Sequence, residues 1–199
     1  MIKTIIFDNH GVLITTIEET GFDAVAKLIG SKIDEFIKIN NKLAEKGDIG
    51  KITTEDFFQR IVKKLNIDNV SPQQLENTLY GNLRRKENVI KLAAKIGLKY
   101  EIVLLTDFSD HFWAWNKKWR LDKLFSKDKI FVSSKLKMHK PQKRIFLYVL
   151  KKLKRKPAEV LFIDDYKNNV DAARNLGINS IHFASLEKLK QDLRKYIKI

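Results

Sequence analysis

The chain contains no cysteine among its 199 residues. This absence excludes a disulfide framework, and it excludes a metal site built from thiolates. A chain without cysteine is also compatible with a reducing compartment. With 44% hydrophobic residues, the chain can instead bury a real core.

Long apolar runs are absent as well. No stretch approaches the roughly 20 apolar residues that span a bilayer. The apolar run before Asp8 is too short for the hydrophobic region of a signal peptide. We therefore expect a soluble cytoplasmic protein without a membrane partner, folded as one large domain or as one domain with a modest insertion.

Acidic residues are scarce relative to basic ones, with 24 Asp and Glu against 39 Lys and Arg, and the net charge is +15. Such a charge raises the possibility of nucleic-acid binding. The lysines are spread along the chain, however, and the densest block, 151–156, suits the negative pole of a helix end. We interpret the charge as a solvated lysine-rich surface. A surface that attracts anionic partners or substrates is the alternative, and nucleic acid is not the expected partner.

Short apolar runs alternate with helical patterns through most of the chain. Predicted strands cover 4–7, 101–105, 129–132, 160–163 and 180–183. Predicted helices cover 89–96, 142–153, 168–176 and 186–197, with Gly97 and Gly177 as C′ glycines after two of them. Several strands are apolar nearly throughout, which is typical of parallel strands buried on both faces. The alternation predicts an α/β fold with a doubly wound parallel sheet.

The stretch after the first strand has a different character. It carries no clear strand and reads as three or four helices, with helical spacing over 22–29 and 34–44. Thr53 and Thr54 precede acidic residues as an N-cap would, and Ser71 precedes a proline in the order of a helix start. The sequence thus predicts an α/β core of residues 1–13 and 89–199, with a helical insert at 14–88.

Polar residues end three of the predicted strands. Asp8 ends the first, Thr106 and Asp107 end the second, and Asp164 with Asp165 end the strand at 160–163. Ligands of doubly wound sheets bind at the carboxyl ends of the strands. One acidic strand end is commonplace as a loop or N-cap residue, but three that converge on one rim favour a shared site.

These residue types suit phosphoryl transfer. A carboxylate such as Asp8 can attack phosphorus, and a Mg²⁺ ion held by carboxylates can offset the repulsion between the two anions. Asp8 and Asp164 can supply the ligands, with Asp165 bound directly or through water. The Thr106 hydroxyl can hold a phosphoryl oxygen. Lys140, which precedes a proline, can bring a positive charge, although taken alone it reads as one more surface lysine.

Four motifs in order resemble those of the haloacid dehalogenase superfamily. They are FDNHGVL at 7–13, LLTD at 104–107, HKPQKRIF at 139–146 and VLFIDDYKNNVDAA at 160–173. The last is the most specific and the second the least. The helical insert also stands where this superfamily has its first type of cap, and residues 47–57 resemble caps of the branch that includes sugar-phosphate phosphatases. The resemblance covers nearly the whole chain.

The resemblance implies an HAD-like α/β core with a helical cap and a Mg²⁺-dependent phosphatase acting through an aspartyl-phosphate. The implied catalytic residues are Asp8, His10, Thr106 and Lys140. The implied substrate ligands are Thr106, Asp107 and Lys140, and the implied metal ligands are Asp8, Asp164, Asp165 and the His10 carbonyl. The partner would be a small phosphorylated substrate, with sugar phosphates the leading class, and the protein a monomer or dimer.

One position departs from the superfamily pattern. Most of its phosphatases carry a second aspartate two residues after the nucleophile, and this chain carries His10. His10 can perform the proton transfer itself, it can contribute only its carbonyl to the metal, or turnover can be crippled so that a weak enzyme or a non-catalytic binding protein remains. Dehalogenases also lack the second aspartate, but the Asp164–Asp165 pair would repel a carboxylate substrate and suits a cation.

Overall fold

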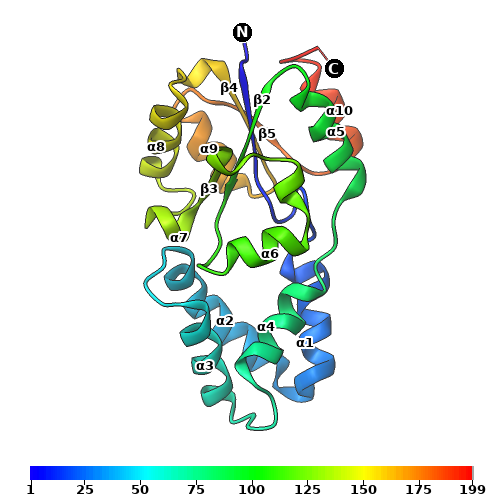
Figure 1. Ribbon diagram of the computed structural model, residues 1–199, viewed down its shortest axis with the longest axis vertical. Helices are drawn as coiled ribbons and strands as arrows, with labels where there is room; N and C mark the ends of the chain where they lie inside the picture. Colours follow the sequence, from blue (N-terminus) through cyan, green and yellow to red (C-terminus); the bar gives the residue numbers. More distant parts are fainter. Residues whose placement is uncertain (199) are drawn as a thin grey trace.

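A five-stranded parallel sheet organises the chain, as the computed structural model shows for residues 1–198 (Figure 1). Its strands are β1 (Thr4–Phe7), β2 (Glu101–Thr106), β3 (Ile130–Val132), β4 (Val160–Asp164) and β5 (Asn179–His182). Their order in the sheet is β3-β2-β1-β4-β5, and all four neighbouring pairs are parallel. From β1 the chain adds β2 and β3 on one side of the sheet, and then β4 and β5 on the other side. The crevice of such a sheet lies where the direction changes, at the carboxyl ends of β1 and β4.

The sheet is buried on both faces because successive strand residues point to opposite sides. On one face, Ile5 and Phe7 pack with residues of α5 (Glu87–Gly97), α6 (Phe112–Lys118) and α10 (Leu186–Leu193). On the other face, Ile6 packs with residues of α8 (Lys143–Leu153) and α9 (Lys167–Arg174). The predicted doubly wound α/β fold is thus confirmed. A short helix, α7 (Ser133–Leu136), follows β3.

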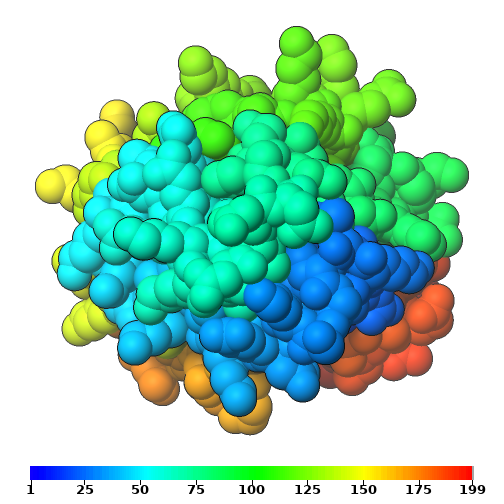
Figure 2. Space-filling model, turned by 90° about the horizontal axis from the view of Figure 1, so that it is seen from below, coloured from blue at the N-terminus to red at the C-terminus, as the bar shows by residue number. Residues whose placement is uncertain are grey.

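Four helices form a separate bundle beyond the carboxyl ends of the strands, at the bottom of Figure 1 and in the centre of Figure 2. They are α1 (Phe22–Ile29), α2 (Ile33–Asp48), α3 (Thr54–Leu65) and α4 (Pro72–Gly81), preceded by a π-helical turn at Ile17–Gly21. The bundle has its own core, which includes Phe36, Phe58 and Leu75. Thr53 caps α3 and Ser71 caps α4, as the sequence predicts. We call α1–α4 the helical bundle.

The chain enters and leaves the helical bundle along two paired segments. Thr15 N donates to Arg84 O at 2.8 Å, and Lys86 N donates to Leu13 O at 2.8 Å. The Lys86 ammonium crosses the same boundary, where it donates to Gly11 O at 2.8 Å. Both connections therefore pass side by side between the sheet and the bundle.

The predicted strands agree with the observed ones to within a residue at each end. Gly177 follows α9 with a φ of 78°, which confirms a left-handed position after that helix. The prediction for Gly97 is wrong, because this glycine is the last residue of α5 and Leu98 follows as the C-cap. Within residues 1–198, no helix is both long enough and apolar enough to span a membrane.

Candidate active site

Three carboxylates meet at the crevice between β1 and β4. Asp8 follows β1, Asp164 is the last residue of β4, and Asp165 comes directly after it. One oxygen from each lies within 4.8 Å of the others. The pairing of β1 with β4 brings them together, because Phe7 is in register with Ile163. Oxygen ligands in such a group match the preference of Mg²⁺.

A buried lysine joins two of these carboxylates. The Lys140 ammonium lies 2.6 Å from Asp8 Oδ1 and 2.8 Å from Asp164 Oδ2. Lys140 is 4% exposed. Although burial acts to lower its pKa, Asp164 and Asp8 raise the pKa of Lys140 above its ordinary value. The lysine therefore stays charged and neutralises part of the site. Lys140 is joined to Pro141 by a cis peptide bond, and α8 begins after it at Lys143.

Asp164 is the most firmly held carboxylate of the group. It is fully buried, and its Oδ1 accepts the backbone N–H of Tyr166 at 2.8 Å. The Asn169 amide donates to both of its oxygens at 3.1 Å. Tyr166 occupies the N-cap of α9, and Asn169 is turned inward. The sequence indicates this inward position, because Asn169 stands beside the apolar Val170 and both fall on the buried face of α9.

The crowding of negative charge affects the other two carboxylates. Burial, with Asp164 and Asp165 nearby, raises the pKa of Asp8 well above its ordinary value, although Lys140 opposes this. Burial and Asp164 also raise the pKa of Asp165. Each would ionise more readily beside a cation. The chemistry of this donor set therefore fits a divalent ion.

A glycine makes room for Asp165. Gly11 has a φ of 76°, and a Cβ at this position would overlap the Asp165 carboxylate. Both facts call for glycine, which alone adopts this backbone region without penalty and has no side chain. On the other side of Asp165, its backbone carbonyl lies 2.8 Å from His182 Nε2. The turn after β1 and the end of β5 thus fix the third carboxylate.

His10 lies in an aromatic slot beside Asp8. Its ring stacks on Phe108 with a centroid distance of 5.4 Å and meets the edge of Trp119 at 5.6 Å. Its Nε2 is buried without a hydrogen-bond partner among residues 1–198. Burial, together with the charge of Lys140, lowers the pKa of His10 to about 3. The ring is accordingly neutral at pH 7 in this structure.

The two polar residues at the end of β2 occupy different places. Thr106 is fully buried, and its hydroxyl has no hydrogen-bond partner in the part of the chain that the structure describes. Asp107 lines the cavity beside the site, and both of its oxygens accept the Lys140 backbone N–H at 3.2 Å. Asp107 therefore positions the backbone of Lys140, while the Thr106 hydroxyl retains unused bonding capacity.

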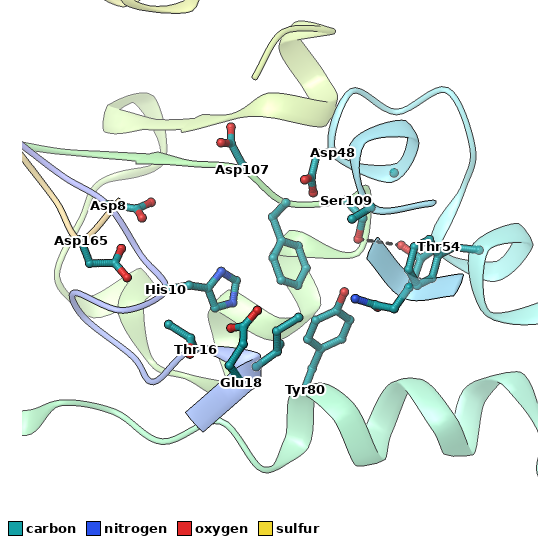
Figure 3. A pocket seen from close by; sticks show the side chains of 16 residues that line it. Asp8, His10, Thr16, Glu18, Asp48, Thr54, Tyr80, Asp107, Ser109 and Asp165 are labelled. Carbon is teal, nitrogen blue, oxygen red and sulfur yellow. Dashed lines mark hydrogen bonds between the residues drawn. The ribbon is translucent and has the colours of Figure 1, made fainter. Parts of the chain in front are cut away.

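A cavity of about 230 Å³ opens from Asp8 and Asp165 toward the helical bundle (Figure 3). We call it the site cavity. Its lining combines residues of both parts of the molecule: Asp8, His10, Thr16, Ile17, Glu18, Asn40, Ala44, Gly47, Asp48, Thr54, Phe57, Tyr80, Asp107, Phe108, Ser109 and Asp165. Figure 3 shows Asp8 and Asp165 at one end, Thr54 and Tyr80 at the other, and His10 between them. The sequence did not identify Glu18 or Tyr80, which come from the insert and lie in no motif, and it included Asp48 only as part of the stretch 47–57 that resembles family caps.

Polar contacts hold the helical bundle over the sheet. Thr54 Oγ1 donates to Ser109 Oγ at 2.8 Å, as drawn in Figure 3, and Thr54 N donates to Asp110 Oδ1 at 2.9 Å. The buried Glu76 carboxylate accepts the indole N–H of Trp115 at 2.8 Å. These contacts close the end of the site cavity that lies opposite Asp8.

Comparisons with known proteins match the chain over most of its length. The model of the haloacid dehalogenase-like hydrolases matches residues 2–177. A sesquiterpene phosphatase of Aspergillus oryzae is 25% identical over 198 residues, which cover 98% of this chain and 96% of the relative. The D-ribitol-5-phosphate phosphatase of Bacteroides thetaiotaomicron is 22% identical over 210 residues, which cover 97% of each protein.

A solved structure resembles the chain over nearly its full length. It is an HAD family enzyme of Bacteroides thetaiotaomicron in complex with magnesium and inorganic phosphate, with a TM-score of 0.80 and 26% identity over 95% of this chain and 99% of that chain. A drimenol cyclase of Aspergillus calidoustus matches only 66 residues at 39% identity, so the chain spans about 12% of that relative. The match over residues 2–177 establishes that this chain belongs to the haloacid dehalogenase-like hydrolase family.

Proposed function

We propose that this hydrolase is a Mg²⁺-dependent phosphatase that removes the phosphoryl group of a small phosphomonoester through an aspartyl-phosphate on Asp8. One observation carries the proposal. The Asp8 carboxylate lies at the end of the site cavity, 2.6 Å from the Lys140 ammonium and beside Asp164 and Asp165. This group of residues can thus hold a cation and a phosphoryl group next to Asp8, the proposed nucleophile.

The metal would be held by Asp8, Asp164 and Asp165, with the His10 backbone carbonyl as a further ligand. Asn169 would keep Asp164 in place, as partners behind metal ligands generally do. When bound, Mg²⁺ would neutralise the charge that the carboxylates and the phosphoryl oxygens bring together. The magnesium and phosphate in the related B. thetaiotaomicron structure support this assignment.

The chain's own residues would carry the reaction in two steps. An Asp8 oxygen attacks phosphorus, the bond between phosphorus and the leaving oxygen breaks, and the alcohol departs with a proton. Water then attacks the aspartyl-phosphate, which releases inorganic phosphate and restores the Asp8 carboxylate. Lys140 and the Thr106 hydroxyl would bind phosphoryl oxygens, with the Lys140 backbone positioned by Asp107. His10 lines the site cavity next to Asp8, and its neutral ring would accept a proton from the attacking water in the second step, whereas the departing alcohol takes its proton from solvent.

The helical bundle would serve as a cap. We propose residues 14–88 as this cap and 1–13 with 89–199 as the catalytic core. Support comes from the separate hydrophobic core of the bundle and from its residues in the wall of the site cavity. A closed bundle would exclude water while phosphorus is attacked and would orient the alcohol.

We propose a small phosphorylated metabolite as the substrate, with sugar phosphates first among the classes to test, in a cytoplasmic monomer or dimer. The cavity of about 230 Å³ has room for a short leaving group. Relatives named as a D-ribitol-5-phosphate phosphatase and as a sesquiterpene phosphatase support a phosphomonoester without selecting one. Dehalogenation is disfavoured, because the Asp164–Asp165 pair would repel a carboxylate substrate.

Phosphate release from a panel of phosphomonoesters tests the proposal. Each substrate is assayed with Mg²⁺, with a chelator in place of Mg²⁺, and with the Asp8→Asn variant. We expect release that requires both Mg²⁺ and Asp8. Release that persists without either would contradict the mechanism.

His10 motivates a second candidate, a non-catalytic phosphate-binding protein. Its ring fills the place where family phosphatases carry an acid, in a slot of Phe108 and Trp119. Folded protein that binds inorganic phosphate with Mg²⁺ but releases none from any ester would select this candidate. Activity that appears in the His10→Asp variant would then identify His10 as the cause.

A further inference from the structure

The wall of the site cavity carries acidic residues and no basic ones. Five carboxylates line it, those of Asp8, Glu18, Asp48, Asp107 and Asp165, and no lysine or arginine is among the described residues of the lining. Asp8 and Asp165 belong to the proposed metal site, and Asp107 accepts the Lys140 backbone N–H. Asp48 and Glu18 remain, on the side where the leaving group would lie.

Asp48 is fixed in position but has no counter-charge. It ends α2, and its backbone carbonyl accepts the Ser133 hydroxyl at 2.6 Å, which ties this helix end to the sheet. Within residues 1–198 its carboxylate makes no hydrogen bond and no ion pair. Burial and the neighbouring charge of Asp107 raise the pKa of Asp48 to about 7, although Lys140 opposes them. A half-buried acid in this condition is stabilised by a cation.

The rest of this wall also accepts positive charge. Glu18 comes from the π-helical turn, is exposed at the opening, and forms no salt bridge with any described residue. Asn40 is 3% exposed, and its amide donates to Asn41 Oδ1 at 3.3 Å, which leaves its carbonyl oxygen as an acceptor. The rings of Phe57 and Tyr80 complete the wall. Aromatic faces attract ammonium groups, and carboxylates and amide oxygens accept their hydrogen bonds.

We infer that the site cavity selects phosphomonoesters whose leaving group carries an ammonium, such as phosphorylated amino alcohols and amino sugars. This inference rests on the proposed phosphatase activity and names the substrate class within it. An ammonium would donate hydrogen bonds to Asp48 or to Glu18 and would offset the charge of the carboxylate that it meets. A hydroxyl in its place would donate without neutralising, and a carboxylate or a second phosphate would add a further anion to a wall that has no cation to meet it.

Three two-carbon substrates of nearly equal size test the order of preference. They are aminoethyl phosphate, hydroxyethyl phosphate and phosphoglycolate, in which the leaving group carries a positive charge, no charge and a negative charge. We expect kcat/KM with Mg²⁺ to fall by about 10-fold at each step of this order. Glucosamine 6-phosphate and glucose 6-phosphate repeat the first step on a larger skeleton. Equal values for the amine and the hydroxyl compound, or a preference for the hydroxyl compound, would overturn the inference.

Two variants assign the preference to named residues. Asp48→Asn and Glu18→Gln keep the size of each side chain and remove its charge. We expect each to reduce the ratio of kcat/KM between amine and hydroxyl substrates, with Asp48→Asn bringing it close to one. Asp68→Asn removes an equal charge from an exposed position of the insert outside the site cavity and serves as the control. A ratio that falls as much in the control as in Asp48→Asn would contradict the assignment.

Binding separates this inference from the proposed function. The Asp8→Asn variant, with Mg²⁺ present, is titrated with the same three esters in a calorimeter. If wild-type protein releases no phosphate but the variant binds the amine ester most tightly, the hydrolytic function fails and the charge selection stands. If wild-type protein hydrolyses all three esters at equal rates, the hydrolytic function stands and the charge selection fails. Absence of binding to every ester would overturn both.

Discussion

The two halves of the site cavity differ in how far their polar groups satisfy one another. On the sheet side, the Lys140 ammonium pairs with Asp8 and Asp164, and Asn169 holds Asp164 from behind. On the side of the helical bundle, the Asp48 carboxylate forms no pair within the described residues. Asp8 and Asp164 in the first half thus have partners before a ligand arrives, whereas the Asp48 carboxylate in the second half has none among the described residues. Chemistry common to a family can reside in the first half, and the choice of substrate can reside in the second.

The largest effect should come from the sheet side. Asp8→Asn removes the proposed nucleophile while it keeps the volume of the side chain. We expect kcat to fall on the order of 10⁴-fold, because the aspartyl-phosphate cannot form. Phosphate release measures the loss, and circular dichroism checks that the fold is intact. Turnover retained within 10-fold of wild type would show that the reaction does not pass through Asp8.

A smaller loss should follow when the support behind a carboxylate is removed. Asn169→Ala takes away the amide that donates to both Asp164 oxygens. We expect Mg²⁺ affinity or kcat to fall about 10- to 100-fold, as is typical of residues that orient metal ligands. Asn168→Ala, at the exposed neighbouring position, is the matched control. Equal effects of the two substitutions would mean that Asn169 acts only through α9.

A glycine pair tests whether the position of Asp165 matters. Gly11 and Gly30 both have positive φ angles, but a Cβ would overlap Asp165 only at Gly11, and nothing lies within 4 Å of it at Gly30. Both alanine variants should lose about 1 kcal/mol of stability through backbone strain. Only Gly11→Ala should also weaken Mg²⁺ binding, which isothermal titration can measure. If Mg²⁺ binding also weakens in the Gly30→Ala variant, backbone strain and not the overlap with Asp165 is the cause.

The smallest effect concerns the bundle side and the pH dependence of stability. Because the pKa of Asp48 is raised to about 7 in the native state, the native protein retains this proton between about pH 4 and pH 7, whereas the unfolded chain releases it. The free energy of unfolding therefore falls as pH rises through this window. We expect a fall on the order of 1 kcal/mol, well below the roughly 4 kcal/mol that linkage would give for a fully buried group, because this carboxylate is half-buried and screened by solvent. In the Asp48→Asn variant, this contribution to the change of the unfolding free energy with pH should vanish. Denaturant unfolding at several pH values measures it, with Asp68→Asn as the control. An unchanged slope in Asp48→Asn would remove Asp48 as the cause.

The sequence revealed the sheet side of the site far better than the bundle side. Asp8, Asp107 and the Asp164–Asp165 pair end apolar strands, and parallel strands place such ends on one rim whatever the rest of the chain does. Lys140 depends on the resemblance to a family, because spacing alone would not distinguish it from other lysines. Asp48 and Tyr80 come from different helices of the insert, and no local pattern states which faces of those helices meet the sheet. Asparagine is common at helix N-caps, but tertiary contact with Asp164 determines the place of Asn169.

The paired crossings between sheet and bundle have a mechanical consequence. Thr15 is bonded to Arg84, and Lys86 is bonded to Leu13, so the two connections act as one ribbon instead of two independent tethers. Two hydrogen-bonded segments bend together about a single axis, but they resist sliding past each other and twisting. If the proposed cap opens about this ribbon, the hydrogen bonds of Thr54 with Ser109 and Asp110 at the other end of the site cavity must break, and so must the bond from the Ser133 hydroxyl to the Asp48 carbonyl.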